Sequence, residues 1–552
     1  MSLLTGLRAR SRFAFVLPIA ATLLGAAPPA QSVGDPAAAQ RIRADVEFLA
    51  SDLLEGRDTG SRGYDIAAAY VATQFRAVGL KPAGENGSWL QQVPFRRSTH
   101  VGVPQASVTL GGKSVALRHG PDIAVRPSLA QQQRAIDAPL VFAGHGVSDR
   151  ALGIDDYAGL NVRGKIVVVL EGTPKGLDSE VASHVESTKN RTAASKGAIG
   201  LIIIANSSAA PAYDILKYVG RPLVDWVNPA GKTVSDSNVL SLSAAISQNL
   251  AKRIFAAAGQ DYAKVRAAGF RAGAMRGFDL GARFSLRDQA SWQNFTSPEV
   301  VGLLPGSDPK LRDEYVVLMG HLDHLGINPD AKPGEDAIYN GALDNAAGVA
   351  TMLEAARSFA NSGKPPRRSV LFIANTGEEK GLRGADYFAA NPTVPRNKIV
   401  GVVDLDMPVL LYDFTDVTAF GADHSTVAVA VRDAARSIGV KVAPDPMPEE
   451  AIFTRSDHYR FVTRGIPAIL LMTGYGNGGE RKWKDFFAKA YHKVTDDMSQ
   501  PIRWDQGARY ADLNYRIARS LADADTRPLW YESDYFGDMF APGQPKARRT
   551  RP

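Results

Sequence analysis

The chain has 552 residues, of which 45% are hydrophobic and 22% charged, a composition typical of a globular protein with two or more domains. Its formal net charge of +7 lies at the two ends, in three arginines near the start and four cations in the last seven residues, Arg8, Arg10, Arg12, Lys546, Arg548, Arg549 and Arg551. A nucleic-acid-binding surface needs cations clustered on a folded face, so we expect no nucleic-acid partner. The absence of cysteine excludes disulfides and thiolate metal ligands.

The N-terminus has the pattern of a secretory signal peptide. Its arginines precede an apolar run at residues 13–27, which ends in small residues. This run is shorter than the roughly 20 apolar residues that cross a membrane, and no other long apolar run follows it. We therefore predict that residues 1–30 are removed and that the mature chain has no transmembrane segment. The expected location is the periplasm or the extracellular space, and the oligomeric state stays open.

The body of the chain divides into three regions. Residues 35–100 begin with apolar positions at three-to-four spacing over 37–53 and 64–78, which predicts two helices. Residues 101–286 consist of short alternating segments, which predict an inserted β-rich domain. Residues 290–530 form the third region, where apolar runs alternate with helical patterns.

The third region predicts the fold class. Strands are expected at 299–304, 315–319, 369–374, 398–403 and 468–472, and helices at 346–360, 385–390 and 424–438. Continuously apolar strands that alternate with helices indicate a sheet covered on both faces. We predict a three-layer α/β/α domain with a mixed, largely parallel sheet, in which ligands bind beyond the carboxyl ends of the strands. Residues 533–552 are rich in Pro, Gly and Arg and predict a flexible tail.

Histidines and acids gather where these strands should end. His321 closes an apolar run, and Asp323 lies two residues further on. Imidazole nitrogen and carboxylate oxygen are ligands that zinc prefers. A ligating histidine usually donates its second N–H to a carboxylate, so Asp323 could orient His321 or be a ligand itself. A lone histidine is more often structural, but this setting favours a functional one.

Asp344 lies in a loop of small residues just before a predicted helix. As an N-cap it would accept hydrogen bonds from free N–H groups at the start of the helix. As a metal ligand it could give one oxygen to each of two cations about 3.5–4 Å apart. The position taken alone favours the cap.

The other candidates are acids after strands and one further histidine. Glu378 and Glu379 are adjacent, so their side chains point in different directions. One could bind metal while the other acts as a general base on the attacking water. Asp404 and Asp406 share one strand face, and Asp406 lies nearer the strand exit, which favours it. His492 is the last candidate ligand.

Five motifs in this order resemble the twenty-eighth metallopeptidase family, which includes bacterial leucyl aminopeptidase, aminopeptidase Y and the glutamate carboxypeptidases. They are His-x-Asp, Gly-Ala-x-Asp-Asn-Ala-x-Gly, Gly-Glu-Glu, Leu-Asp-Met and Tyr-His-x-x-x-Asp, all between Gly320 and Asp497. The resemblance implies that residues 35–100 and 290–530 form one catalytic zinc-peptidase domain. Residues 138–255 look similar to a protease-associated domain.

The resemblance also implies roles for the candidate residues. It implies two zinc ions per chain, one held by His321, Asp344 and Asp406 and the other by Asp344, Glu379 and His492. Glu378 becomes the general base, Asp323 the partner of His321, and Asp344–Asn345 a cis peptide. Tyr491 and Tyr475 are candidate oxyanion contacts, and Asp457 is either a pocket residue or a helix cap.

The function implied is that of an exopeptidase acting on peptides, most simply an aminopeptidase. The alternatives are a glutaminyl-cyclase-like transferase with one zinc and a non-catalytic binding protein with a vestigial site, and the intact ligand set argues against both. The insert contains none of the proposed ligands. We therefore expect it to be dispensable for the chemistry and to limit which substrates reach the site. Its three histidines, His119, His145 and His184, are interpreted as structural or surface residues.

Overall fold

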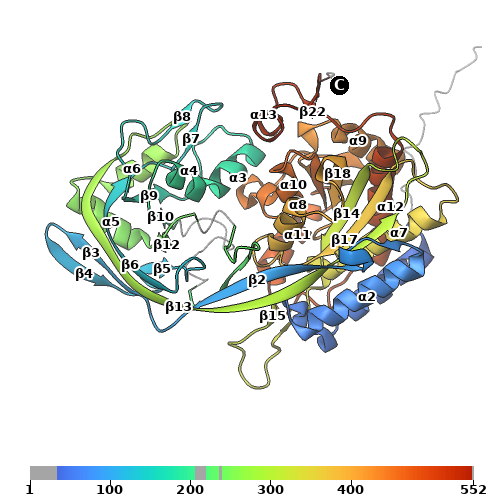
Figure 1. Cartoon of the computed structure of the whole chain (residues 1–552), viewed down its shortest axis with the longest axis horizontal. Coiled ribbons are helices and arrows are strands. Elements are labelled where there is room, and N and C mark those ends of the chain that lie inside the picture. The colour runs from blue at the N-terminus through green and yellow to red at the C-terminus, as the bar shows by residue number, and fades with distance from the viewer. Residues whose placement is uncertain (1–33, 206–218, 235–238, 550–552) are drawn as a thin grey trace, which may run out of the picture.

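The structure, a computed structural model, describes residues 34–205, 219–234 and 239–549, so the predicted signal peptide lies outside the described residues. Two lobes are joined by two long antiparallel strands, β2 (Leu90–His100) and β13 (Phe278–Leu304) (Figure 1). The boundary predicted at residue 286 falls inside β13. Burial alternates along the first part of β13 and becomes continuous at residues 297–302. The strand therefore passes from a sheet with one exposed face to a sheet covered on both faces.

The larger lobe, residues 34–100 and 290–549, contains a mixed sheet in the order β1-β13-β17-β14-β18-β21-β19-β20. Strands β17, β14, β18 and β21 are parallel. These strands confirm the predicted ones to within a few residues. Their bounds are β1 (Lys81–Pro82), β14 (Tyr315–His321), β17 (Ser369–Asn375), β18 (Ile399–Asp404), β19 (Asp416–Phe420), β20 (Lys441–Val442) and β21 (Ala468–Thr473).

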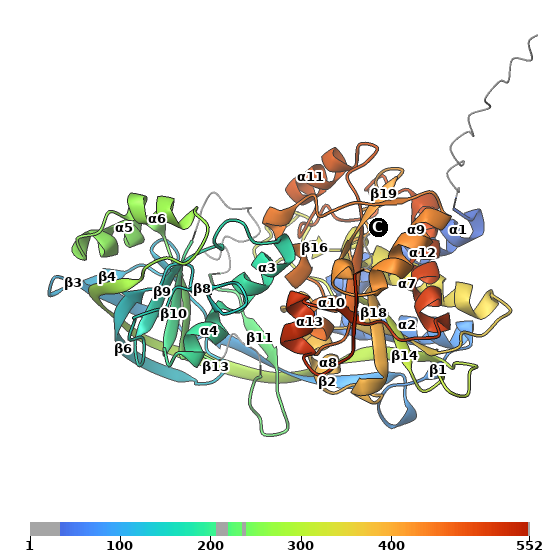
Figure 2. The ribbon, with the colours of Figure 1, turned by 90° about the horizontal axis from the view of Figure 1, so that it is seen from above.

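Helices cover both faces of this sheet, which confirms the predicted three-layer arrangement (Figure 2). One face is covered by α1 (Pro36–Leu49), α2 (Arg62–Val78), α7 (Ala347–Asn361), α9 (Val427–Ser437) and α12 (Trp504–Asp523). The other face carries α8 (Arg383–Ala390) and α10 (His458–Val462), and α11 (Gly479–Lys489) follows β21. The central strands are fully buried because both layers exclude water from them.

The smaller lobe is built on its own sheet, which shares β13. Its strands are β3 (Gln105–Leu110), β4 (Lys113–Leu117), β5 (Ile123–Val125), β6 (Gln133–Phe142), β9 (Ile166–Leu170), β10 (Gly200–Ile204) and β12 (Leu242–Ile246). Strands β6, β9, β10 and β12 are parallel. Its helices are α3 (Ser179–Ser187), α4 (Lys189–Ser195), α5 (Gln248–Ala257) and α6 (Tyr262–Gly269). The insert is thus a mixed α/β unit with a β-rich core.

Short strand pairs complete the fold. They are β7 (Ser148–Asp149) with β8 (Ile154–Asp155), β15 (Gly326–Ile327) with β16 (Ile338–Tyr339), and β11 (Leu223–Trp226) with β2. Among the described residues, no helix combines the length and the apolar character needed to cross a membrane.

The residues after Ser533 differ from the flexible tail that their composition predicts. Asp534 caps helix α13 (Tyr535–Phe540), and β23 (Lys546–Ala547) pairs in parallel with β22 (Trp530–Tyr531). Phe536 is fully buried, and its ring centroid lies 4.6 Å from that of His424. The prediction was wrong because the overall composition of the segment hides the effect of one residue. Burial of the Phe536 ring holds the segment against the larger lobe.

The same segment contributes to an ion-pair cluster around His424. Its Nε2 lies 2.6 Å from Glu180 Oε2 in the smaller lobe, and its Nδ1 lies 2.7 Å from Asp534 Oδ2. Burial lowers the pKa of His424, but the two carboxylates outweigh it and raise that pKa to about 10. A second cation, Arg549, lies 3.5 Å from Asp534. The charged imidazole therefore ties both lobes and the C-terminal segment together.

This cluster predicts a loss of stability at alkaline pH. A raised folded-state pKa gives stabilisation that is complete below the unfolded value near 6.5 and disappears as pH rises through about 10. We expect this group to contribute on the order of 2–4 kcal/mol to the free energy of unfolding at neutral pH. Thermal melts of the wild type should fall between pH 7 and 10 more steeply than those of His424→Gln. Parallel curves for the two proteins would contradict the assignment.

Candidate metal centre

The predicted site residues meet at one edge of the larger sheet because parallel strands end there together. Strand β14 ends at His321, β17 ends three residues before Glu378, and β18 ends two residues before Asp406. Asp344 comes from the turn before α7, and His492 from the loop after α11. The peptide bond Asp344–Asn345 is cis, as the resemblance implies.

The first group consists of three buried residues, His321, Asp344 and Asp406. Its Nε2 lies 3.3 Å from Asp344 Oδ1 and 3.1 Å from Asp406 Oδ1. Asp404, the other acid of this strand, points deeper and accepts the His458 N–H at 3.0 Å. The Oγ of Ser456 lies 2.7 Å from an Oδ2 of each aspartate. The alternation of side chains along the strand did not distinguish Asp404 from Asp406, and in the structure only Asp406 contacts His321.

A second group lies on the other side of Asp344. The Nε2 of His492 is 3.3 Å from Asp344 Oδ2 and 3.3 Å from Glu379 Oε2. His324, which the sequence analysis did not select, is fully buried, and its Nδ1 lies 2.7 Å from Glu379 Oε1. His324, Asp344 and Glu379 form a second set with metal-ligand spacing beside His321, Asp344 and Asp406. The only available signal for His324 was its place in the same five-residue run as His321.

Asp323 supports the site differently from the predicted carboxylate–histidine contact. The Nδ1 of His321 lies 3.0 Å from the main-chain oxygen of Asp323. The Asp323 carboxylate instead accepts the N–H groups of Glu378 at 3.2 Å and Glu379 at 3.4 Å, and the Thr59 hydroxyl at 2.9 Å. The expectation was wrong about the contacting atom because the side chain turns towards the Gly-Glu-Glu loop. Asp323 therefore positions that loop.

Asp457 matches neither predicted role. It is fully buried, lines neither cavity of the site, and accepts a hydrogen bond from Asn375 Nδ2 at 2.5 Å. It occupies the N-cap position of α10, but its side chain makes no capping bond. Its two neighbours in the chain, Ser456 and His458, both donate hydrogen bonds to Asp404. Asp457 is thus a buried polar residue behind the site.

The electrostatics of the site favour a bound cation. Burial opposes charge on His492, but Glu379 and Asp344 outweigh burial and raise the pKa of His492 to about 10. Burial likewise opposes charge on His321, and Asp406 and Glu378 raise its pKa well above the ordinary value. Asp344 Oδ2, Glu379 Oε1 and both ring nitrogens of His324 are buried and make no well-oriented hydrogen bond among the described residues, although His324 Nδ1 lies 2.7 Å from Glu379 Oε1. Imidazoles and carboxylates with unused lone pairs fit zinc.

Glu378 borders these groups, and burial raises the pKa of its carboxyl well above the usual range, with Glu379 adding to the effect and His321 opposing it. It lines a small cavity of about 30 Å³ together with His321, Asp344 and Asp406. The rest of this cavity is mainly apolar, with Met407, Ile452, Leu470, Met472 and Phe487. A water or a small group could be held here against the charged residues.

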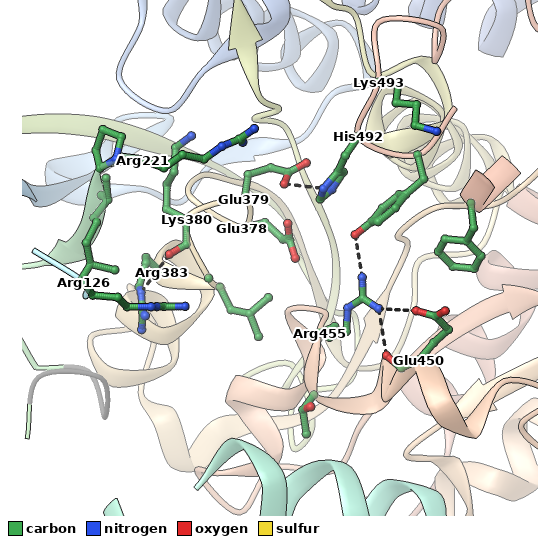
Figure 3. Close-up of a pocket in the computed structure, with 18 of the residues that line it drawn as sticks. Arg126, Arg221, Glu378, Glu379, Lys380, Arg383, Glu450, Arg455, His492 and Lys493 are labelled. Atoms are coloured by element: carbon green, nitrogen blue, oxygen red, sulfur yellow. Dashed lines mark hydrogen bonds and ion pairs between the residues drawn. The ribbon is translucent and has the colours of Figure 1, made fainter. Parts of the chain in front are cut away.

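A larger cavity of about 1140 Å³ opens between the lobes (Figure 3). Arg126 and Arg221 of the smaller lobe line it beside Lys380 and Arg383 of the larger lobe. Tyr475 lines this cavity only, whereas Tyr491 lines both cavities. The hydroxyl of Tyr491 accepts a hydrogen bond from Arg455 Nη2 at 2.9 Å, and its ring stacks on His492. The insert therefore forms one wall of the approach to the candidate metal centre.

Comparison with known families matches two parts of the chain. Residues 299–518 match peptidase family M28, and residues 136–249 match the PA domain. A probable zinc metalloprotease of Pyrenophora teres f. teres (strain 0-1) is 37% identical over 108 residues, which cover 20% of this chain and 22% of the relative. Leupeptin-inactivating enzyme 1 of Streptomyces exfoliatus is 27% identical over 231 residues, 38% of this chain and 46% of that enzyme. The chain thus spans less than half the length of these relatives.

A solved structure shares the fold over most of the chain. The aminopeptidase from Aneurinibacillus sp. strain AM-1 superimposes with a TM-score of 0.50 and 19% identity, covering 90% of this chain and 97% of that one. The family match includes every residue of the two groups around Asp344, and the PA match covers the strands of the smaller lobe from β6 to β12. The chain therefore contains a peptidase family M28 domain, and a PA domain is inserted ahead of the matched residues.

Proposed function

We propose that the protein is an exported exopeptidase, most specifically an aminopeptidase, with two zinc ions. His321, Asp344 and Asp406 would hold one ion, and Asp344, Glu379 and His492 the other, with His324 beside the second. The observation that supports this most strongly is the position of Asp344, whose Oδ1 lies 3.3 Å from His321 and whose Oδ2 lies 3.3 Å from His492. One carboxylate thus faces both groups, as a shared site requires. Export rests on the signal-peptide pattern of residues 1–30.

Zinc held by these residues would lower the pKa of a coordinated water towards neutrality and would polarise a carbonyl oxygen. Glu378 then acts as the general base, because it borders the same small cavity as His321, Asp344 and Asp406. It would pass the proton taken from the water to the leaving amine. Asp323 fixes this base through the N–H of Glu378.

Tyr491 is suited to bind the developing oxyanion. Arg455 donates to its hydroxyl oxygen, so the phenolic proton is available for another acceptor in the cavity. The small cavity beside the metal groups has room for a water or a small group, while the larger cavity between the lobes suits a short peptide. A pocket that ends beside the reacting groups favours cleavage at a chain end.

The proposal predicts which substrates are cleaved. Purified protein should hydrolyse aminoacyl-anilides with a free amine and short peptides one residue at a time. N-acetylated versions of the same anilides should react at least about 10²-fold more slowly, because the free amine would no longer be recognised. Kinetic assays on matched pairs measure this ratio. Cleavage of N-blocked dipeptides in place of anilides would indicate a carboxypeptidase, and cyclisation of N-terminal glutamine would indicate a transferase.

A further inference from the structure

Helix α3 belongs to the PA domain by sequence but packs into the larger lobe (Figures 1 and 2). It lies between β9 and α4, and Asp178 caps it by accepting the N–H of Glu180 at 3.0 Å. Val181 and Val185 on this helix are buried in the hydrophobic core of the larger lobe. The strands of the PA domain form separate cores of their own. Helix α3 is therefore physically part of the catalytic lobe.

The polar face of α3 contacts one segment of that lobe, residues 451–459, which we call the 451–459 segment. Ser183 Oγ donates to the Ala451 carbonyl at 2.9 Å and lies 3.1 Å from Thr454 Oγ1. The Nδ1 of His184 lies 2.6 Å from the hydroxyl of Tyr459. These side chains are nearly inaccessible, with exposed fractions of 3% for Ser183 and 4% for His184. Both ends of the segment are thus held by the same helix.

Two residues in the middle of the 451–459 segment reach the candidate active site. Arg455 Nη2 donates to the Tyr491 hydroxyl at 2.9 Å, and Arg455 Nη1 donates to Glu450 Oε2 at 3.0 Å. Ser456 Oγ lies 2.7 Å from Asp406 Oδ2. The residues that α3 holds therefore flank, in the same short segment, the two residues that contact Tyr491 and Asp406.

The start of α3 is fixed independently of this segment. Glu180 Oε1 accepts the Gly421 N–H at 2.7 Å, and Glu180 Oε2 lies 2.6 Å from His424 Nε2. The His184 ring also packs against Tyr535, Phe536 and Phe540 of the C-terminal segment. A helix held at its start, its apolar face and its side has little freedom to move, so it can serve as a fixed support.

We propose that α3 is a positioning element of the active site, in which Ser183 and His184 hold the 451–459 segment so that Arg455 and Ser456 meet Tyr491 and Asp406. The catalytic part of this inference rests on the proposed function. It assigns the PA domain a role in the rate of the reaction as well as in access to the cleft. It differs from two expectations, that the insert is dispensable for the chemistry and that His184 is a structural or surface residue.

The test uses the full-length, zinc-loaded protein and single substitutions. Ser183→Ala removes the bonds to Ala451 and Thr454, and His184→Phe keeps the aromatic packing but removes the ring nitrogen. With a small aminoacyl-anilide, both should lower kcat by about 10-fold or more and change KM by less than about 3-fold, because a displacement near 1 Å can cost about 10²-fold in rate. Ser183→Thr keeps the hydroxyl and should restore most of the lost kcat.

Ser195→Ala is the matched control. Ser195 lies at the exposed end of the neighbouring helix α4, and among the described residues its hydroxyl donates to the Thr192 carbonyl in its own turn. Its variant should keep the wild-type kcat. A drop in kcat of equal size in Ser195→Ala, or unchanged kcat in both Ser183→Ala and His184→Phe, would overturn the proposal.

A second measurement does not depend on substrate. Hydrogen–deuterium exchange of the 451–459 amides should accelerate by about 10-fold or more in Ser183→Ala and His184→Phe, while exchange in strand β14 stays unchanged. If the wild type fails to cleave aminoacyl-anilides, the proposed function fails, but this exchange experiment still tests the support by α3. Equal exchange in wild type and both variants would show that α3 does not hold the segment.

Discussion

Replacing Glu378 by glutamine should lower kcat by about 10²–10⁴-fold while leaving the zinc content unchanged. The amide keeps the size of the side chain and the N–H contact of residue 378 with Asp323, but it cannot accept a proton from water. Stopped assays with an aminoacyl-anilide, combined with elemental analysis of the same sample, measure both quantities. A proton acceptor that is lost without loss of metal is the expected signature of a general base.

Glu379→Gln is the matched control because it makes the same chemical change at the adjacent position. Glu379 lies 2.7 Å from His324 and 3.3 Å from His492, so its variant should lose metal affinity along with activity. Activity in Glu379→Gln should therefore recover in part when excess zinc is added, whereas Glu378→Gln should not recover. The roles would be reversed if Glu379→Gln kept both ions and stayed inactive while Glu378→Gln remained active.

Chelation should abolish activity, and protein purified without chelator should contain about two zinc ions per chain. The reason is that the two groups around Asp344 have separate histidines, with His321 on one oxygen and His492 on the other. Elemental analysis gives the stoichiometry, and addition of zinc or cobalt to the chelated protein should restore the rate. One ion per chain at full activity would rule out the shared arrangement.

Elemental analysis of single variants can distinguish the roles of the two histidines near Glu379. His492→Ala should lose one ion, because its Nε2 faces both Asp344 and Glu379. His324→Ala should weaken that ion less, since His324 contacts Glu379 alone among these carboxylates. Equal losses in the two variants would place His324 among the ligands of the second ion.

The amino-acid sequence by itself determined the fold class and most of the site. The central strands are continuously apolar because they are covered on both faces, and that pattern is visible without a structure. Part of the site was visible because His321, Glu378 and Asp406 follow strands whose carboxyl ends must meet, and the family resemblance implied the roles of Asp344 and His492. His321, Asp344, Glu379, Asp406 and His492 do lie together.

Only the tertiary structure decided which atoms meet. Asp323 was identified as a support, yet its side chain holds the Gly-Glu-Glu loop and its main chain holds His321. A spacing of two residues fixes proximity along the chain but leaves the direction of the side chain to packing. For the same reason Asp457, which the sequence left open between a pocket residue and a helix cap, lines neither cavity and makes no capping bond, and His324 was passed over although it contacts Glu379.

The contacts of helix α3 and of the C-terminal segment with the catalytic lobe were not predicted from the sequence. Helix α3 lies in the PA match, but its apolar residues complete the core of the catalytic lobe, and its His184 meets Tyr459 across 275 residues of chain. The tail is similar, because Phe536 finds its partner His424 more than a hundred residues earlier. Local sequence patterns show which residues are apolar enough to be buried. The surface against which these residues pack forms only when the whole chain has folded, since burial depends on complementary shape and on the total area removed from water.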